Sequence, residues 1–186
     1  MAERVCPWWA GYLLASPIRQ WMTEDPEDLF APFVRDGMTV LEPVPGMGFF
    51  TLPLARMVGP KGRVIAVDIQ AKMLDGLRRR AARAGLLDRV ETRLADPNSM
   101  KLGDLRGKVD FVLAFAVVHE MPSVEAFFGE AAATLKPGGT LFLAEPSGHV
   151  KPEAFQRELE AARLCGLREA SRPKVRRSSA AVLKKA

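Results

Sequence analysis

Between residues 39 and 144, short and almost continuously apolar runs alternate with longer segments of mixed polarity. The apolar runs lie at 39–41, 63–67, 90–94, 111–115 and 140–144. Strands that are covered on both faces read as runs of this kind. The segments at 50–58, 70–84, 123–135 and 151–165 have the period and length of helices. This alternation predicts an α/β domain built on a doubly wound, mostly parallel sheet with crossover helices.

The two ends of the chain depart from this alternation. Residues 1–38 contain four prolines and the aromatic cluster of Trp8, Trp9, Tyr12 and Trp21. They predict short helices that cover the sheet, one of which begins with Asp25 as N-cap and proline in its first turn. The aromatic cluster either belongs to the core under these helices or forms a lid over a substrate pocket. Residues 167–183 lack a helical period and predict two closing strands paired as an antiparallel hairpin.

The formal net charge of +5 is concentrated at the C-terminus, where residues 168–186 hold seven Lys or Arg and one acid. Cations on an edge hairpin block pairing with other strands, and an RNA-binding edge is the alternative. Four arginines at positions 78, 79, 80 and 83 predict the solvated face of the second helix.

Two cysteines and two histidines, spread far apart along the chain, do not form a four-ligand zinc cage of the usual CxxC type, so no metal site is predicted. So few cysteines also favour a reducing, cytoplasmic compartment. The longest apolar run, 111–118, is too short to cross a membrane. We therefore expect a soluble protein with no membrane span.

The first apolar run leads into an acid, a turn with glycines and a helix. Glu42 precedes Gly46 and Gly48, and the helical segment follows at about Phe50. Such a turn presents backbone N–H groups and a helix N-terminus to a ligand above the strand. A nicotinamide-dinucleotide fingerprint requires a further glycine where this chain has Thr51, so that interpretation fails.

The next three strand ends also carry candidate site residues. Asp68 ends the second strand, Asp96 follows the third, and Phe115 ends the fourth. Open α/β sheets bind ligands at this edge. A carboxylate such as Asp68 can accept hydrogen bonds from both hydroxyls of a ribose, and the alternative is an N-cap before Gln70.

This ordered set resembles the class I S-adenosylmethionine-dependent methyltransferases over about residues 40–144, and most closely the small-molecule group of quinone-biosynthesis and arsenite enzymes. The resemblance implies a Rossmann-like seven-stranded sheet, with S-adenosylmethionine as cofactor and S-adenosylhomocysteine as product. It implies that Gly46 and Gly48 face the methionine part, that Glu42 organises its amino group, and that Asp68 holds the ribose. Ile69 would lie against the adenine face and Asp96 would contact its amino group. The implied cofactor-binding residues are Glu42, Val44, Pro45, Gly46, Gly48, Asp68, Ile69, Asp96 and Phe115.

Two further features follow from the resemblance. The segment 135–141, with a turn at Pro137-Gly138-Gly139, matches the family's entry into the fifth strand. The family usually has glycine at the position of Val44, where a branched side chain would narrow the pocket or shift the turn. Weaker binding, a repacked pocket and a noncatalytic Rossmann-like binding or scaffold protein are the open alternatives.

Methyl transfer needs a base only when the acceptor carries a proton that must leave. His119, just past the fourth strand, is the candidate base, since its ordinary pKa lies near neutrality. The alternative is a structural histidine bonded to Glu120 or to backbone. The chain lacks the cysteine set that arsenic chemistry requires. The sequence therefore predicts methyl transfer to a small molecule, with RNA methylation through the basic edge as an alternative.

The length of 186 residues leaves room for one domain only. We expect an N-terminal helical cover at 1–38, a cofactor-binding core at 39–144, and the last helix and closing hairpin at 145–186. Substrate recognition then falls to the cover and to the loops at the strand ends.

Overall fold

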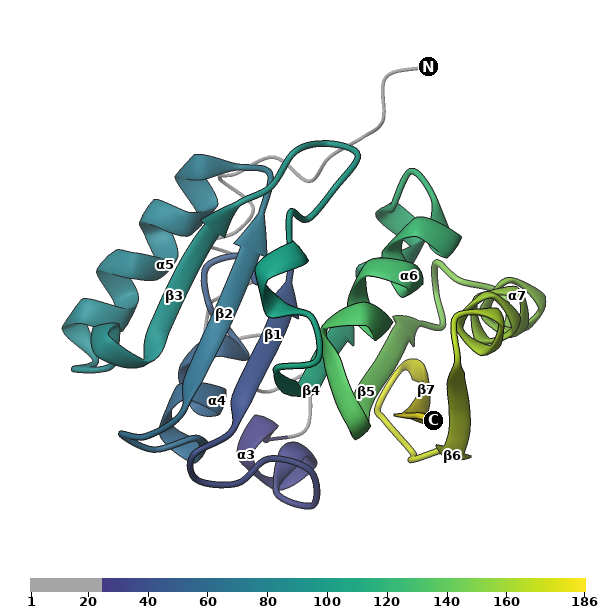
Figure 1. The fold of residues 1–186 in the computed structure, drawn as a ribbon, viewed down its shortest axis with the longest axis horizontal. Coiled ribbons are helices and arrows are strands. Elements are labelled where there is room, and N and C mark those ends of the chain that lie inside the picture. Colours follow the sequence, from purple (N-terminus) through teal and green to yellow (C-terminus); the bar gives the residue numbers. More distant parts are fainter. Residues whose placement is uncertain (1–24) are drawn as a thin grey trace.

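The structure is a computed structural model that describes residues 25–186. Its sheet has seven strands in the order β3-β2-β1-β4-β5-β7-β6, which fan from one edge to the other in Figure 1. The strands are β1 (Thr39–Pro43), β2 (Arg63–Asp68), β3 (Val90–Leu94), β4 (Val109–Phe115), β5 (Leu135–Pro146), β6 (Leu167–Ser171) and β7 (Ser178–Lys185). Pairing from β3 through β5 is parallel, whereas β7 runs antiparallel to both β5 and β6. The predicted mostly parallel sheet and C-terminal hairpin are confirmed.

The helices occur where the apolar period predicts them. They are α3 (Pro26–Phe30), α4 (Thr51–Met57), α5 (Ala71–Arg83), α6 (Val124–Thr134) and α7 (Pro152–Leu164), with 3-10 turns η1 (Leu87–Arg89), η2 (Gly103–Leu105) and η3 (Val118–Glu120). The segments predicted for the last four helices differ from these bounds only by including the capping residue at each end. Asp25 caps α3 as expected, because its side chain accepts a 2.8 Å hydrogen bond from the Glu27 backbone N–H. The aromatic cluster at Trp8, Trp9, Tyr12 and Trp21 lies outside the described residues.

Helices pack on both faces of the sheet, so neighbouring strand residues are buried in different cores. Val40 belongs to the core under α3, α4 and α5, while Leu41 belongs to the core under α6 and α7. Both side chains have no exposed surface. Coverage on both faces explains why the central parallel strands read as near-continuous apolar runs. The expected apolar run at 90–94 is wrong, because β3 lies at the edge of the sheet, carries three polar residues, and has only its first residue buried.

The segment predicted as a turn at Pro137-Gly138-Gly139 lies within β5. Leu135 pairs with Val109 and Thr140 pairs with Phe111, so four residues of β5 lie opposite one residue of β4. The segment is therefore a bulge inside the strand, and α6 ends before it. A turn and a bulge use glycine at positive φ in the same way, and Gly138 has φ of 72°.

Several cations of the C-terminal hairpin have partners within the fold. Arg172 pairs with Glu169 at 2.8 Å along the edge of the sheet. The Nζ of Lys184 donates to Thr140 Oγ1 at 2.6 Å, and that of Lys185 donates to the Leu135 carbonyl at 2.7 Å. None of the helices between residues 25 and 186 combines the length and apolar character that a membrane crossing requires.

Candidate active site

The parallel register brings the predicted residues to one edge of the sheet. Glu42 pairs with Ala66 across β1 and β2, and Asp68 pairs with Leu94 across β2 and β3. Asp96 follows β3 by two residues and Phe115 ends β4. The four strand ends therefore lie next to one another at the carboxyl edge, as the chain order predicted.

The turn after β1 is built from three residues with positive φ. Val44 has φ of 52°, Gly46 of 56° and Gly48 of 87°. A Cβ at Gly48 would come within 2.4 Å of Leu77 Cδ1, so a side chain at that position would require the buried Leu77 to move. A Cβ at Gly46 would meet nothing within 4 Å among the described residues, so glycine there serves the backbone conformation and leaves the turn open above it.

Val44 holds the left-handed conformation even though it is β-branched. Its backbone N–H donates to the Val67 carbonyl at 2.7 Å, which continues the β1–β2 pairing by one residue. A left-handed conformation costs an L-residue about 1–2 kcal/mol. The side chain remains 37% exposed, so it lies at the surface of the turn and not in the core.

Helix α5 fixes this turn from behind. The side chain of Met47 lies so close to Gly76 that a Cβ there would be 3.1 Å from its Cγ. Arg80, one turn further along α5, donates from its guanidinium to the Met47 carbonyl. Burial of the Arg80 side chain lowers its pKa. The expected solvated face of this helix is therefore wrong for Arg80, which is partly buried, although Arg78 and Arg79 are exposed.

Glu42 is held below the turn by the first residue of α4. It is 3% exposed, and its Oε2 accepts a 2.6 Å hydrogen bond from Thr51 Oγ1. Thr51, where the dinucleotide fingerprint would require glycine, is fully buried. The threonine thus orients a carboxylate that the sequence places directly before the glycine turn.

Asp68 presents a carboxylate oxygen that the described residues leave unsatisfied. Its Oδ1 accepts a 2.8 Å hydrogen bond from the Gln70 N–H, while Oδ2 is buried without a partner. Burial raises the pKa of Asp68 to about 6 against the opposing hydrogen bonds from the backbone of Gln70 and Ile69, and the charge of Glu120 raises it further. Asp68 is therefore not the N-cap of α5, a position that Gln70 occupies: one oxygen accepts a hydrogen bond within the turn before the helix, and the other fits a ligand that donates hydrogen bonds, such as a ribose. Ile69 beside it is 43% exposed, as a surface against a flat base requires.

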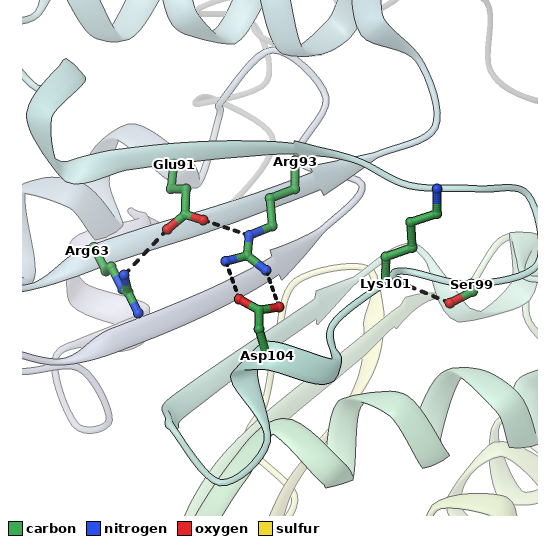
Figure 2. Close-up of polar contacts among 6 residues, drawn as sticks. All are labelled: Arg63, Glu91, Arg93, Ser99, Lys101 and Asp104. Atoms are coloured by element: carbon green, nitrogen blue, oxygen red, sulfur yellow. Dashed lines mark hydrogen bonds and ion pairs between the residues drawn. The ribbon is translucent and has the colours of Figure 1, made fainter.

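Asp96 lies at the end of β3 but already has an ion partner. Its Oδ2 is 2.8 Å from Lys101 Nζ, with both side chains 58% exposed. The loop closes on itself through paired backbone hydrogen bonds between Asp96 and Ser99, and the Lys101 N–H donates to Ser99 Oγ at 3.1 Å (Figure 2). A contact between Asp96 and an adenine amino group would share or replace this exposed pair.

An ion network anchors the far end of the same loop to the sheet. Arg93 on β3 forms two hydrogen bonds with Asp104 of η2, at 2.7 and 2.8 Å. It also bonds to Glu91 at 2.6 Å, and Glu91 lies 3.5 Å from Arg63 on β2 (Figure 2). The two-point Arg93–Asp104 contact fixes the direction of the segment that returns from the Asp96 loop.

Two of the predicted residues form apolar walls of this edge. Phe115 stacks at a tilt on Phe50, with ring centroids 4.6 Å apart, and so connects the end of β4 to the start of α4. Pro45 is buried within the glycine turn. Both pack the turn against the sheet.

His119 in η3 is bonded to a carboxylate from β5 and not to its neighbour Glu120. Its Nδ1 contacts Oε2 of Glu145, a residue with no exposed surface. The other oxygen, Oε1, accepts hydrogen bonds from the N–H groups of Val117 at 3.2 Å and Val118 at 2.7 Å. Sequence reasoning missed Glu145, although an acid that ends an apolar strand was a visible signal.

Further titratable groups surround this pair. The ring of His149 stacks parallel to that of His119, with centroids 6.4 Å apart. Glu158 of α7 is 5% exposed, and its buried Oε2 has no partner among the described residues. Burial, assisted by the charge of Glu145, raises the pKa of Glu158 to about 7. The hydrogen bond to Glu145 raises the pKa of His119, against the effect of burial.

One cavity lies at the opposite end of the sheet. Its volume is about 260 Å³, and its lining includes Asp110, Gly138 and Thr140 at the amino ends of β4 and the paired part of β5. Lys136 there is paired with Asp110 at 2.6 Å. Ligands of open α/β sheets bind at the carboxyl ends of the strands, so we assign the site to the Asp68 edge.

Comparison with known proteins agrees with the geometry. The family model described as a methyltransferase domain matches residues 40–139. A ubiquinone biosynthesis O-methyltransferase of Paramagnetospirillum magneticum is 36% identical over 113 residues, which are 61% of this chain and 41% of that protein. An arsenite methyltransferase of Halobacterium salinarum is 31% identical over 109 residues, or 59% of this chain and 27% of that one. The chain thus spans less than half the length of these relatives.

A solved structure matches over nearly the whole chain. It is an S-adenosylmethionine-dependent methyltransferase from Aquifex aeolicus, with a TM-score of 0.85 and 25% identity over 98% of this chain and 100% of that one. The family model covers more than half of the present sequence. The chain therefore belongs to the methyltransferase-domain family and is a class I S-adenosylmethionine-dependent methyltransferase in fold and cofactor type.

Proposed function

We propose that this protein transfers a methyl group from S-adenosylmethionine to a small-molecule acceptor. The observation that carries the proposal is the buried Oδ2 of Asp68, which has no partner among residues 25–186 and lies beside an open glycine turn. A buried carboxylate oxygen without a donor is costly, and a ribose hydroxyl would supply one. The relatives named for quinone and arsenite methylation support a small acceptor.

The other predicted residues have compatible positions for the same cofactor. Gly46 and Gly48 would let the backbone approach the methionine part, while Glu42 would organise its amino group directly or through water. Asp68 would accept from the ribose hydroxyls, with Ile69 against the adenine face. The remaining predicted contacts are Val44, Pro45, Asp96 and Phe115.

S-adenosylmethionine, when bound, supplies a methyl carbon on a positively charged sulfur that a nucleophile can attack. The chain itself positions the two partners and excludes water. His119 would receive a proton from the acceptor, since its side chain is 27% exposed and its Nδ1 is already engaged. Glu145 holds the imidazole in place.

Arsenic is the less suitable acceptor. The chain has two cysteines, and burial raises the pKa of Cys165, whose Sγ contacts the Glu125 carbonyl at 3.7 Å. A protonated thiol is a poor ligand for a thiol-seeking element. A hydroxyl or amine acceptor therefore suits the described residues better, and a cytoplasmic location remains a prediction from composition.

Thermal unfolding with S-adenosylhomocysteine tests cofactor binding directly. At a hundred times its Kd the ligand should stabilise the protein by about 2.7 kcal/mol, which is roughly 5–10 °C in Tm. The Asp68→Asn variant should lose most of this shift, while Asp88→Asn, at an exposed position in η1, should keep it. Absence of a shift at millimolar ligand would contradict the proposal and favour the noncatalytic scaffold. If the shift is observed, mass spectrometry of small molecules that co-purify with the protein would identify acceptor candidates.

A further inference from the structure

Glu145 is held in one orientation by three groups. The two backbone N–H donors of Val117 and Val118 share its Oε1, which leaves Oε2 facing His119 Nδ1. Because the side chain has no exposed surface, water does not compete for these contacts.

This arrangement determines which nitrogen of His119 carries the proton. A carboxylate can only accept, so the nitrogen that faces it must donate. The neutral imidazole therefore keeps its proton on Nδ1, and Nε2 retains a lone pair. The same relation between a buried carboxylate and an imidazole orients the base in serine hydrolases.

We propose that Glu145 is a positioning residue that keeps the His119 proton on Nδ1, so that Nε2 serves as the base for an acceptor with an O–H or N–H group. This inference rests on the proposed methyl transfer. The acceptor's O–H or N–H bond breaks as its proton moves to Nε2, and the electron pair stays on the acceptor atom. The resulting imidazolium is stabilised by Glu145 and later returns the proton to water.

The charges around His119 restrict the acceptor further. Glu120 on η3, Glu145 on β5 and Glu158 on α7 each favour the protonated imidazole, and His149 stacks beside it from the loop after β5. The ionised carboxylates among them oppose an acceptor that carries a carboxylate or phosphate next to its reacting atom, so the proposal favours a neutral hydroxyl or an amine as the acceptor group.

Nitrogen NMR of the full chain labelled with 15N-histidine tests the proposal without cofactor or acceptor. The protein has two histidines, and a His149→Gln variant assigns their signals. In the neutral form, His119 should show a protonated Nδ1 and an unprotonated Nε2. The opposite tautomer, or an even mixture of the two, would overturn the proposal.

The Glu145→Gln variant provides the sharper test. The amide oxygen can keep the hydrogen bonds from Val117 and Val118, which turns the amide N–H₂ toward Nδ1. Nδ1 must then accept, so the proton should move to Nε2, and the imidazole pKa should fall by about one unit or more with loss of the charge. An unchanged tautomer in the folded variant would contradict the proposal.

Glu158→Gln is the matched control. It removes a nearby buried charge but leaves the Glu145–His119 contact intact, so the His119 pKa should fall by less and the proton should stay on Nδ1. If Glu145→Gln does not fold, the tautomer of the unaltered protein still decides the question. Failure of S-adenosylhomocysteine to bind would instead refute the proposed function while leaving the NMR result untouched.

Discussion

Substitutions at Val44 would measure the free-energy cost of its left-handed backbone conformation. With φ of 52°, any residue that has a Cβ is strained there by about 1–2 kcal/mol. Glycine avoids this strain but gains chain entropy when unfolded, worth about 0.5–1 kcal/mol. The Val44→Gly variant should therefore be more stable than Val44→Ala by about 1 kcal/mol, or roughly 2–4 °C in Tm.

Comparison of these two variants isolates the backbone effect, because both lose the partly covered methyl groups of valine. Urea unfolding gives the free energy of each. Leu94, 57% exposed at the end of β3, provides the control position. There the order should reverse, with Leu94→Gly less stable than Leu94→Ala by about 0.5–1 kcal/mol, because a strand residue has no left-handed strain to relieve. The same order at both positions would refute the reasoning.

Titration of the same Val44 variants with S-adenosylhomocysteine separates an impaired cofactor site from a tolerant one. The turn already holds a left-handed conformation with valine in place, so Val44→Gly should change the Kd by less than about tenfold, which corresponds to 1.4 kcal/mol. A larger gain shared by Val44→Ala would show that the side chain blocks the cofactor. A larger gain confined to Val44→Gly would show that backbone strain weakens binding.

Two further predictions concern buried side chains. Arg80→Met should lose about 1.5–3 kcal/mol of stability and weaken S-adenosylhomocysteine binding, because the Met47 carbonyl loses a charged donor. Arg79→Met, at an exposed position, should leave the stability and the binding unchanged. Equal effects of the two variants would contradict the assigned contact. Folding raises the pKa of Glu158 from 4.5 to about 7, so its contribution to stability is full below pH 4.5 and is lost as the pH rises through about 7. The difference in unfolding free energy between Glu158→Gln and the unaltered protein, measured by urea unfolding, should therefore grow by about 3 kcal/mol in favour of the variant from about pH 4 to pH 8. A difference that does not change with pH would refute this prediction.

The sheet and the meeting of the strand ends at one edge were predictable because each depends on local order along the chain. Parallel strands covered on both faces must be apolar throughout, and crossover helices must lie between them. Once the strands are placed, the residues that end them, such as Asp68 and Phe115, must meet at one edge. The chemistry of each end could then be assigned in sequence order.

Contacts between distant segments were not predictable in this way. His119 has an acid directly beside it in Glu120, and nothing local shows that its partner is Glu145, 26 residues away. Arg80 lies among arginines of similar character, and only the packing of α5 against Met47 distinguishes it. The glycines at 138 and 139 fit a turn and a bulge equally well, so the sequence could not decide between them.

The strained backbone positions at the strand ends follow one physical rule. Val44 follows β1 closely and Ala116 follows β4, and both have positive φ without being glycine. The N–H of Val44 donates to the Val67 carbonyl and that of Ala116 to the Ala144 carbonyl, each at 2.7 Å, on the neighbouring strand. The sheet thus extends its hydrogen bonds by one residue before the chain turns sharply, and these bonds offset the strain. After the Ala116 turn, the next two N–H groups hold Glu145, while the Val44 turn leads into the glycines of the proposed cofactor site. Strain at these two positions is therefore the structural cost of directing the turns toward the proposed cofactor site and the proposed base.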